Sequence, residues 1–190
     1  MRTLTRAVVV VAALLALAVF WFPLWSYQLE APQYPEGLGM SIWIDRIGGQ
    51  LNTINQLNHY IGMKHIDPDA LPELRVMPWV IGFMCAAGLL VAIIGRLSGL
   101  VAWVGAYVLL GVGGLVDFYR WLYDYGHNLS PDAPISMEPF MPSMLGRQEV
   151  ANFWVASWPD VGGIALMASA LLAIAALALE LWSRRQAAGA

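Results

Sequence analysis

The sequence predicts an all-α membrane protein, in which four transmembrane helices carry an outer cap formed by two long loops. Composition is the first reason: hydrophobic residues make up 59% of the 190 residues and charged residues only 12%, a balance typical of membrane proteins. Clustering is the second, because the apolar residues fall into four stretches, each close to the ~20 residues that a helix needs to cross a bilayer. Backbone polar groups find no water inside lipid, so such stretches must be helical.

We expect a single membrane domain covering residues 1–190. Its predicted helices span about residues 7–25, 76–94, 100–124 and 161–182. The first helix follows two arginines, as the apolar part of a signal peptide does, but it is long for that role and ends in an aromatic run from Phe20 to Trp25. Aromatic residues of this kind suit the membrane interface, so we expect an uncleaved anchor.

The basic residues near the helix ends lie on one side of the predicted membrane. They are Arg2, Arg6, Arg96, Arg184 and Arg185. Because arginine and lysine are enriched in cytoplasmic segments, we expect both termini and the short turn at Arg96 to be cytoplasmic. The outer loops, about residues 26–75 and 125–160, are then expected on the periplasmic side of a bacterial inner membrane, with the lipid bilayer as the first partner.

The third helix extends beyond its apolar part, which ends near Val116, into an aromatic segment that keeps helical spacing. Asp117, Arg120 and Asp124 lie three and four residues apart in this segment, so their side chains share one helix face. We therefore expect these three side chains to form an ion-pair network at the boundary of the membrane.

The first outer loop contains a second kind of helix, shorter and amphipathic. Residues 42–62 show helical spacing of apolar side chains, including Leu51, Ile54 and Ile61. Gly62 is a suitable stop for this helix. We expect the helix to lie on the membrane surface or to pack against the second loop.

Proline dominates the second outer loop and forbids a continuing helix there. The prolines concerned are Pro131, Pro134, Pro139 and Pro142. We therefore expect a stiff, extended lid after the third helix. Asp160 follows this lid and is expected to cap the fourth helix.

Several classes of function find no support in the sequence. No phosphate-binding loop, nucleophile elbow or zinc-protease motif occurs, so we expect no enzyme. The basic residues form no patch, which disfavours nucleic-acid binding, and the single cysteine, Cys85, excludes an internal disulfide. Glycines in the apolar stretches are expected to be positions of close helix packing. They are Gly111, Gly113, Gly114, Gly162 and Gly163.

Histidine and methionine side chains gather in the two outer loops, which hold all three histidines of the chain. Thioether and imidazole groups are ligands that copper(I) prefers. His59 and Met63 are four residues apart, so a helix would point them the same way. The sequence therefore predicts a copper(I) site in the cap. Its candidate ligands are His59, Met63, His65 and His127, with Met137 and Met141 closing over them from the lid.

Plainer explanations of the same residues stay open. Methionine often fills gaps in protein cores, and a histidine near a membrane surface is commonly a hydrogen-bonded structural residue. The alternative function is then a structural or assembly subunit of a membrane respiratory complex that binds no metal and uses the cap as a docking surface. A haem or quinone subunit is disfavoured, because the predicted transmembrane helices contain no histidine.

Two stretches of the loops carry a resemblance to a known family. Asn58-His59-Tyr60-Ile61-Gly62-Met63 and Asp124-Tyr125-Gly126-His127-Asn128-Leu129 resemble motifs of small bacterial inner-membrane proteins encoded near the copper-maturation genes of nitrous oxide reductase. The resemblance implies a role in copper delivery to a periplasmic cuproenzyme of denitrification, with a copper chaperone or that enzyme as partner. It implies no particular set of ligands.

Overall fold

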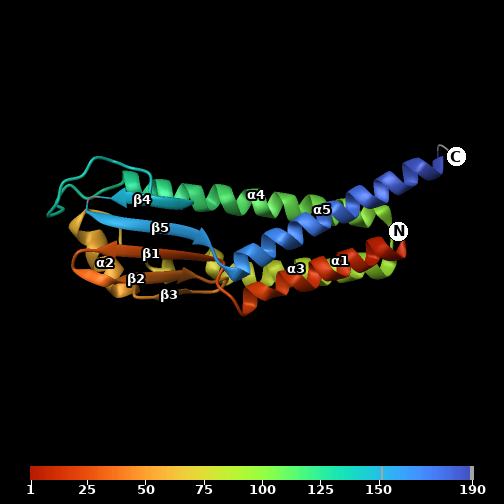
Figure 1. Cartoon of the computed structure of the whole chain (residues 1–190), viewed down its shortest axis with the longest axis horizontal. Helices are drawn as coiled ribbons and strands as arrows, with labels where there is room; N and C mark the ends of the chain where they lie inside the picture. The colour runs from red at the N-terminus through yellow and green to blue at the C-terminus, as the bar shows by residue number, and fades with distance from the viewer. Residues whose placement is uncertain (151, 189–190) are drawn as a thin grey trace.

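Long apolar helices form one end of the molecule in the computed structural model, which describes residues 1–150 and 152–188 (Figure 1). Within these residues, four helical segments are long and apolar enough to cross a membrane, as predicted. They are α1 (Thr3–Ala16) with the 3-10 turn η1 (Leu17–Phe20), α3 (Glu73–Ile94), α4 (Leu97–His127) and α5 (Val161–Ala188). The start of α1, the end of α5 and the turn between α3 and α4 lie at the end remote from the cap (Figure 1).

The prediction of an all-α fold is wrong for the cap, where the described residues form a five-stranded antiparallel sheet. Its strands are β1 (Trp25–Ala31), β2 (Tyr34–Ile42), β3 (Ile47–Gly49), β4 (Gly146–Val150) and β5 (Phe153–Pro159), in the order β3-β2-β1-β5-β4. The first three strands come from the first loop and the last two from the second. The two loops are therefore halves of one sheet, joined where β1 pairs with β5.

Alternation of side chains explains why β1 forms a strand with one buried face. Tyr27, Leu29 and Ala31 are buried, whereas Gln28 and Glu30 between them are exposed. Successive side chains on a strand point to opposite faces, so this pattern places every apolar residue on the same side. One face of the sheet is therefore solvated, and the other closes over the core of the cap.

The first transmembrane helix is shorter at its C-terminal end than the predicted span of residues 7–25. The α-helix ends at Ala16, a 3-10 turn follows, and the chain is already extended at Trp25. Within α1, Val9 and Ala12 are fully buried against α3 and α5. This helix is thus part of the packed membrane core.

Close packing at glycine is confirmed for one of the two predicted groups, whereas the other group has no close neighbour among the described residues. A Cβ atom at Gly162 would overlap the carbonyl oxygen of Phe22, and one at Gly163 would overlap that of Leu24. These glycines let the start of α5 lie against the chain that leaves η1. A Cβ on three glycines of α4 would instead meet nothing within 4 Å among the described residues. Those three are Gly111, Gly113 and Gly114.

The core of the cap lies between the sheet and α2 (Leu51–Tyr60), with the end of α4 alongside. Ile54 and Leu57 of α2 pack with Leu29 and Met40 of the sheet, and Leu122 of α4 joins them. The helix predicted over residues 42–62 is thus confirmed only in its second half, because the first half is used by β2 and β3. Since α4 contributes to both the membrane core and this one, it connects the two parts of the molecule.

Candidate metal site in the cap

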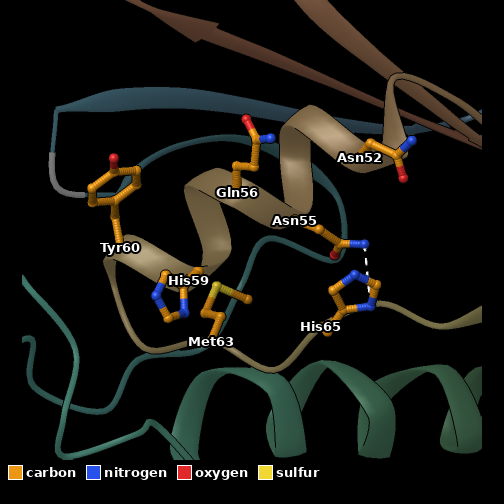
Figure 2. A pocket seen from close by; sticks show the side chains of 7 residues that line it. All are labelled: Asn52, Asn55, Gln56, His59, Tyr60, Met63 and His65. Carbon is orange, nitrogen blue, oxygen red and sulfur yellow. Dashed lines mark hydrogen bonds between the residues drawn. The ribbon is translucent and has the colours of Figure 1, made fainter.

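The candidate site is a cavity on the solvent-facing side of α2 and the segment after it (Figure 2). Its volume is about 680 Å³. Imidazole, thioether, amide and phenol groups line it. The lining residues are Asn52, Asn55, Gln56, His59, Tyr60, Met63 and His65.

Helical periodicity places the α2 part of this lining. Asn52, Gln56, His59 and Tyr60 are exposed, and their spacing of four, three and one residues puts them on one side of the helix. The opposite side is apolar and packs on the sheet, with Ile54 nearly fully buried. Burial of the apolar side therefore fixes which way His59 points.

A turn after α2 returns the chain toward His59. Gly62 adopts a left-handed conformation with φ of +78°, which favours glycine, and the N–H of Met63 donates to the Asn58 carbonyl at 2.9 Å. The thioether of Met63 lies beside the His59 imidazole as a result (Figure 2). The predicted proximity of His59 and Met63 is therefore present, although α2 ends at Tyr60 and a turn, rather than continuous helix, creates it.

The Asn55 side chain holds the segment that carries His65. Its amide oxygen accepts from the Ile66 N–H at 2.8 Å, and its amide nitrogen donates to the Ile66 carbonyl at 3.0 Å. The same nitrogen lies 3.4 Å from Nδ1 of His65. When the Asn55 amide donates to Nδ1, the His65 proton lies on Nε2. Metal binding through Nε2 then requires the other tautomer, with the proton on Nδ1, and this tautomer gives up the long contact with Asn55.

The remaining candidate ligands lie outside this lining in the described part of the chain. The His127 ring stacks on Tyr123 with centroids 3.7 Å apart, and its Nδ1 donates to the Tyr123 carbonyl at 3.0 Å. Met137 is half-buried against the core of the cap, and Met141 is also half-buried. Three of the six candidates, His59, Met63 and His65, thus line one cavity. Within it the His59 and Met63 side chains lie beside each other, whereas His65 lies apart from them, next to Asn55 (Figure 2).

The two loops do meet next to the site. The N–H of Ser130 donates to the Gly62 carbonyl at 2.8 Å, and the N–H of Ile135 donates to the Tyr60 carbonyl at 2.9 Å. Lys64 forms an ion pair with Asp124 at 2.6 Å. The predicted ion-pair network within α4 is therefore wrong. Asp124 pairs with Lys64 of the first loop rather than with Arg120, and no ion pair of Arg120 occurs among the described residues.

The chemistry of the site depends on sulfur. Among the described residues, no group of three or more histidine, cysteine, aspartate or glutamate side chains is placed to hold a metal ion. A site made of His59 and His65 needs the thioether of Met63 as a third donor. Thioether donors favour copper(I) over the harder divalent ions.

The sequence indicates a polar stripe of amide groups on α2 but does not assign them to the candidate site. Asn52 and Asn55 recur at helical spacing with Asn58 and form a visible polar stripe in the sequence, which was the available signal. The structural use of Asn55, as a clamp on Ile66, depends on the turn at Gly62 and has no local signature. No family model, curated protein or solved structure matches the chain.

Proposed function

We propose that the chain is a copper(I)-binding accessory protein of a bacterial inner membrane, with His59, Met63 and His65 as ligands. The observation that carries this proposal is that all three side chains line one cavity of the cap. Two imidazoles and one thioether suit copper(I), which binds soft donors at low coordination number. No carboxylate occurs among the described residues of the lining, and carboxylates are the groups that harder ions prefer.

Exposure of the two histidines supports a role in transfer rather than permanent storage. His59 and His65 are exposed, whereas Met63 is half-buried and packs against the core of the cap. An incoming donor group from another protein can reach the imidazoles and replace them one at a time. The proposed function is therefore relay of copper(I) by exchange of ligands.

The proposed recipient is a periplasmic cuproenzyme or its copper chaperone. The arginines at the helix ends support a cytoplasmic position for the membrane end that carries the chain termini, so the cap and its site face the periplasm on this proposal. The resemblance of the two loop motifs to proteins encoded near the nitrous oxide reductase genes makes maturation of that enzyme, in denitrification, the first role to test.

Anaerobic titration with copper(I) against a colorimetric chelator of known affinity tests the proposal. The purified full chain is expected to take one copper(I) ion from the chelator. His59→Ala and Met63→Leu should each weaken binding by at least about tenfold, since even outer-sphere partners of metal ligands contribute 10–100-fold. His127→Ala and Met141→Leu are the matched controls and should bind as the unchanged protein does.

Two results contradict the proposal. One is copper(I) affinity no greater than that of a weak competing chelator. The other is an equal loss of affinity in the control variants and in the His59 and Met63 variants, because that would reflect damage to the cap rather than loss of ligands.

The second candidate function is a structural or assembly subunit of a membrane respiratory complex. It is favoured by a face of α4 on which Leu109 and Val112 are 74% and 55% exposed, next to three glycines with open space around them. Small residues allow another transmembrane helix to approach closely. A stoichiometric partner that co-purifies equally well with the His59→Ala variant would support this function over copper relay.

A further inference from the structure

The cap contains a second, apolar cavity, which is partly open to the surface. It has a volume of about 150 Å³ and lies between the inner face of the sheet, α2 and the end of α4. Its walls are overwhelmingly apolar. They come from all five strands, from α2 and α4, and from the chain segments that follow these two helices. Representative lining residues are Leu29, Met40, Leu57, Leu122, Phe140 and Val155.

A space of this size is unusual in a folded domain. Protein interiors pack as densely as organic crystals and contain few voids larger than a water molecule. An apolar cavity of ~150 Å³ lined by leucine, isoleucine and phenylalanine stays dry and takes up benzene or xenon. The cavity in the cap has the volume and the wall chemistry of such a site.

Water has little to bind in this cavity. The Tyr27 hydroxyl, one of the few polar groups in its wall, already donates to the Ser143 carbonyl at 3.3 Å. Among the described residues, the buried side-chain polar atoms that lack a partner are Nε of Arg6 and Oε2 of Glu73, and neither residue lines the cavity. An ordered water needs two to four polar partners, so a hydrocarbon suits the space better.

One wall of the cavity comes from a segment that is not part of the sheet. Residues 128–145 form neither helix nor strand, and Phe140, Pro142 and Ser143 of this segment contribute to the wall. The N–H of Phe140 donates to the Gly126 carbonyl at 3.0 Å, which holds the segment against the end of α4. Further hydrogen bonds tie the segment to α2 and to the sheet, but none of them is a bond that pairs two strands, so a displacement of this wall would leave the strand pairing intact.

We infer that this cavity is a binding site for a hydrocarbon ligand, of the size of an aromatic ring or the end of an acyl chain. α4 runs without interruption from the membrane core to Leu122 in the cavity wall, which brings the site to the border of the bilayer. The ligand is therefore either the chain of a lipid or a small apolar molecule from solution. The site requires no copper, although Met63 lines both cavities.

Benzene is the first probe, added to the full-length protein in nanodiscs while thermal unfolding is followed. Benzene should raise the unfolding midpoint by about 2–4 °C. Val155→Phe fills the cavity and should abolish the rise. Ala156→Phe adds a ring to the neighbouring position on the outer face of β5 and should keep it. Leu122→Ala enlarges the cavity and should respond to benzene at least as strongly as the unchanged protein.

Lipids with a photoreactive group at the end of one acyl chain identify the source of the ligand. Crosslinks to residues 118–125 or 137–145 that benzene prevents support an acyl chain. Stabilisation by benzene without such crosslinks supports a small apolar molecule. Three results would overturn the inference. In the first, benzene stabilises neither the unchanged protein nor Leu122→Ala, and in the second it stabilises only Leu122→Ala. In the third, Val155→Phe responds to benzene as strongly as Ala156→Phe. Loss of copper binding leaves all these readouts unaffected, so the two proposals fail independently.

Discussion

Replacing Gly62 with alanine tests whether the turn after α2 builds the candidate site. Gly62 has φ of +78°, a conformation that L side chains rarely adopt. A Cβ atom there would lie 2.9 Å from the Ser130 carbonyl oxygen and 3.0 Å from the Ala133 Cβ. The variant therefore carries two costs, one from its own backbone and one from displacement of the second loop.

The two costs can be given separate magnitudes. The left-handed conformation costs a residue other than glycine about 1–2 kcal/mol, and forcing packed neighbours apart costs about 1–3 kcal/mol. Gly62→Ala should therefore lower the free energy of unfolding of the cap by about 2–5 kcal/mol. Gly146 is the matched control, because its φ is +98° and a Cβ would meet nothing within 4 Å. Gly146→Ala should lower it by about 1–2 kcal/mol.

Urea unfolding in nanodiscs, followed by tryptophan fluorescence of the sheet, measures both variants. The expected difference between them is about 1–3 kcal/mol, which is the cost of displacing the second loop. Copper(I) affinity should fall in Gly62→Ala, because Met63 follows directly, and should stay unchanged in Gly146→Ala. Equal losses of stability in the two variants would refute the reasoning, since the contact between the loops would then contribute nothing.

Three further predictions concern pH, the membrane core and orientation. Burial raises the pKa of Tyr27 to about 12. This residue should therefore contribute about 3 kcal/mol of stability that is fully present below pH ~10 and lost as pH rises from ~10 to ~12. Alkaline unfolding curves should show this loss of stability, and the Tyr27→Phe variant should not show it. Glu180 is 2% exposed and accepts from Nε of Arg184 at 3.0 Å, so Glu180→Ala should cost about 3–5 kcal/mol in thermal or denaturant unfolding. In a background without the native cysteine, Asp132→Cys should react with an impermeant maleimide in intact spheroplasts, whereas Ser98→Cys should react only after permeabilisation; the reverse pattern would contradict a periplasmic cap.

The transmembrane helices were predictable because their signal is local. Apolar length alone decides that a segment spans lipid, and α3, α4 and α5 follow from it. The strands were less accessible, although β1 alternates between buried and exposed residues. The first helix was expected to continue to Trp25, and this expectation concealed the start of that alternation. The pairing of Leu29 with Val155 joins residues that are too far apart in the sequence for any local pattern to reveal it.

The candidate site was predictable in part for a similar reason. Spacing of four residues suggested that His59 and Met63 lie together, and they do, because a turn at Gly62 replaces the last part of the expected helix. The position of His127 depends on its stacking on Tyr123, within its own helix. That local contact competes with any role in a shared site, and the residue types alone did not indicate which arrangement would prevail.

X-ray absorption spectroscopy of the copper(I)-loaded protein tests the central claim most directly. The account predicts a spectrum with one sulfur and two imidazole nitrogens around the copper. Met63→Leu should remove the sulfur contribution, and Met141→Leu should keep it. A copper environment without sulfur, or one whose sulfur persists in Met63→Leu, would contradict a site built from His59, Met63 and His65.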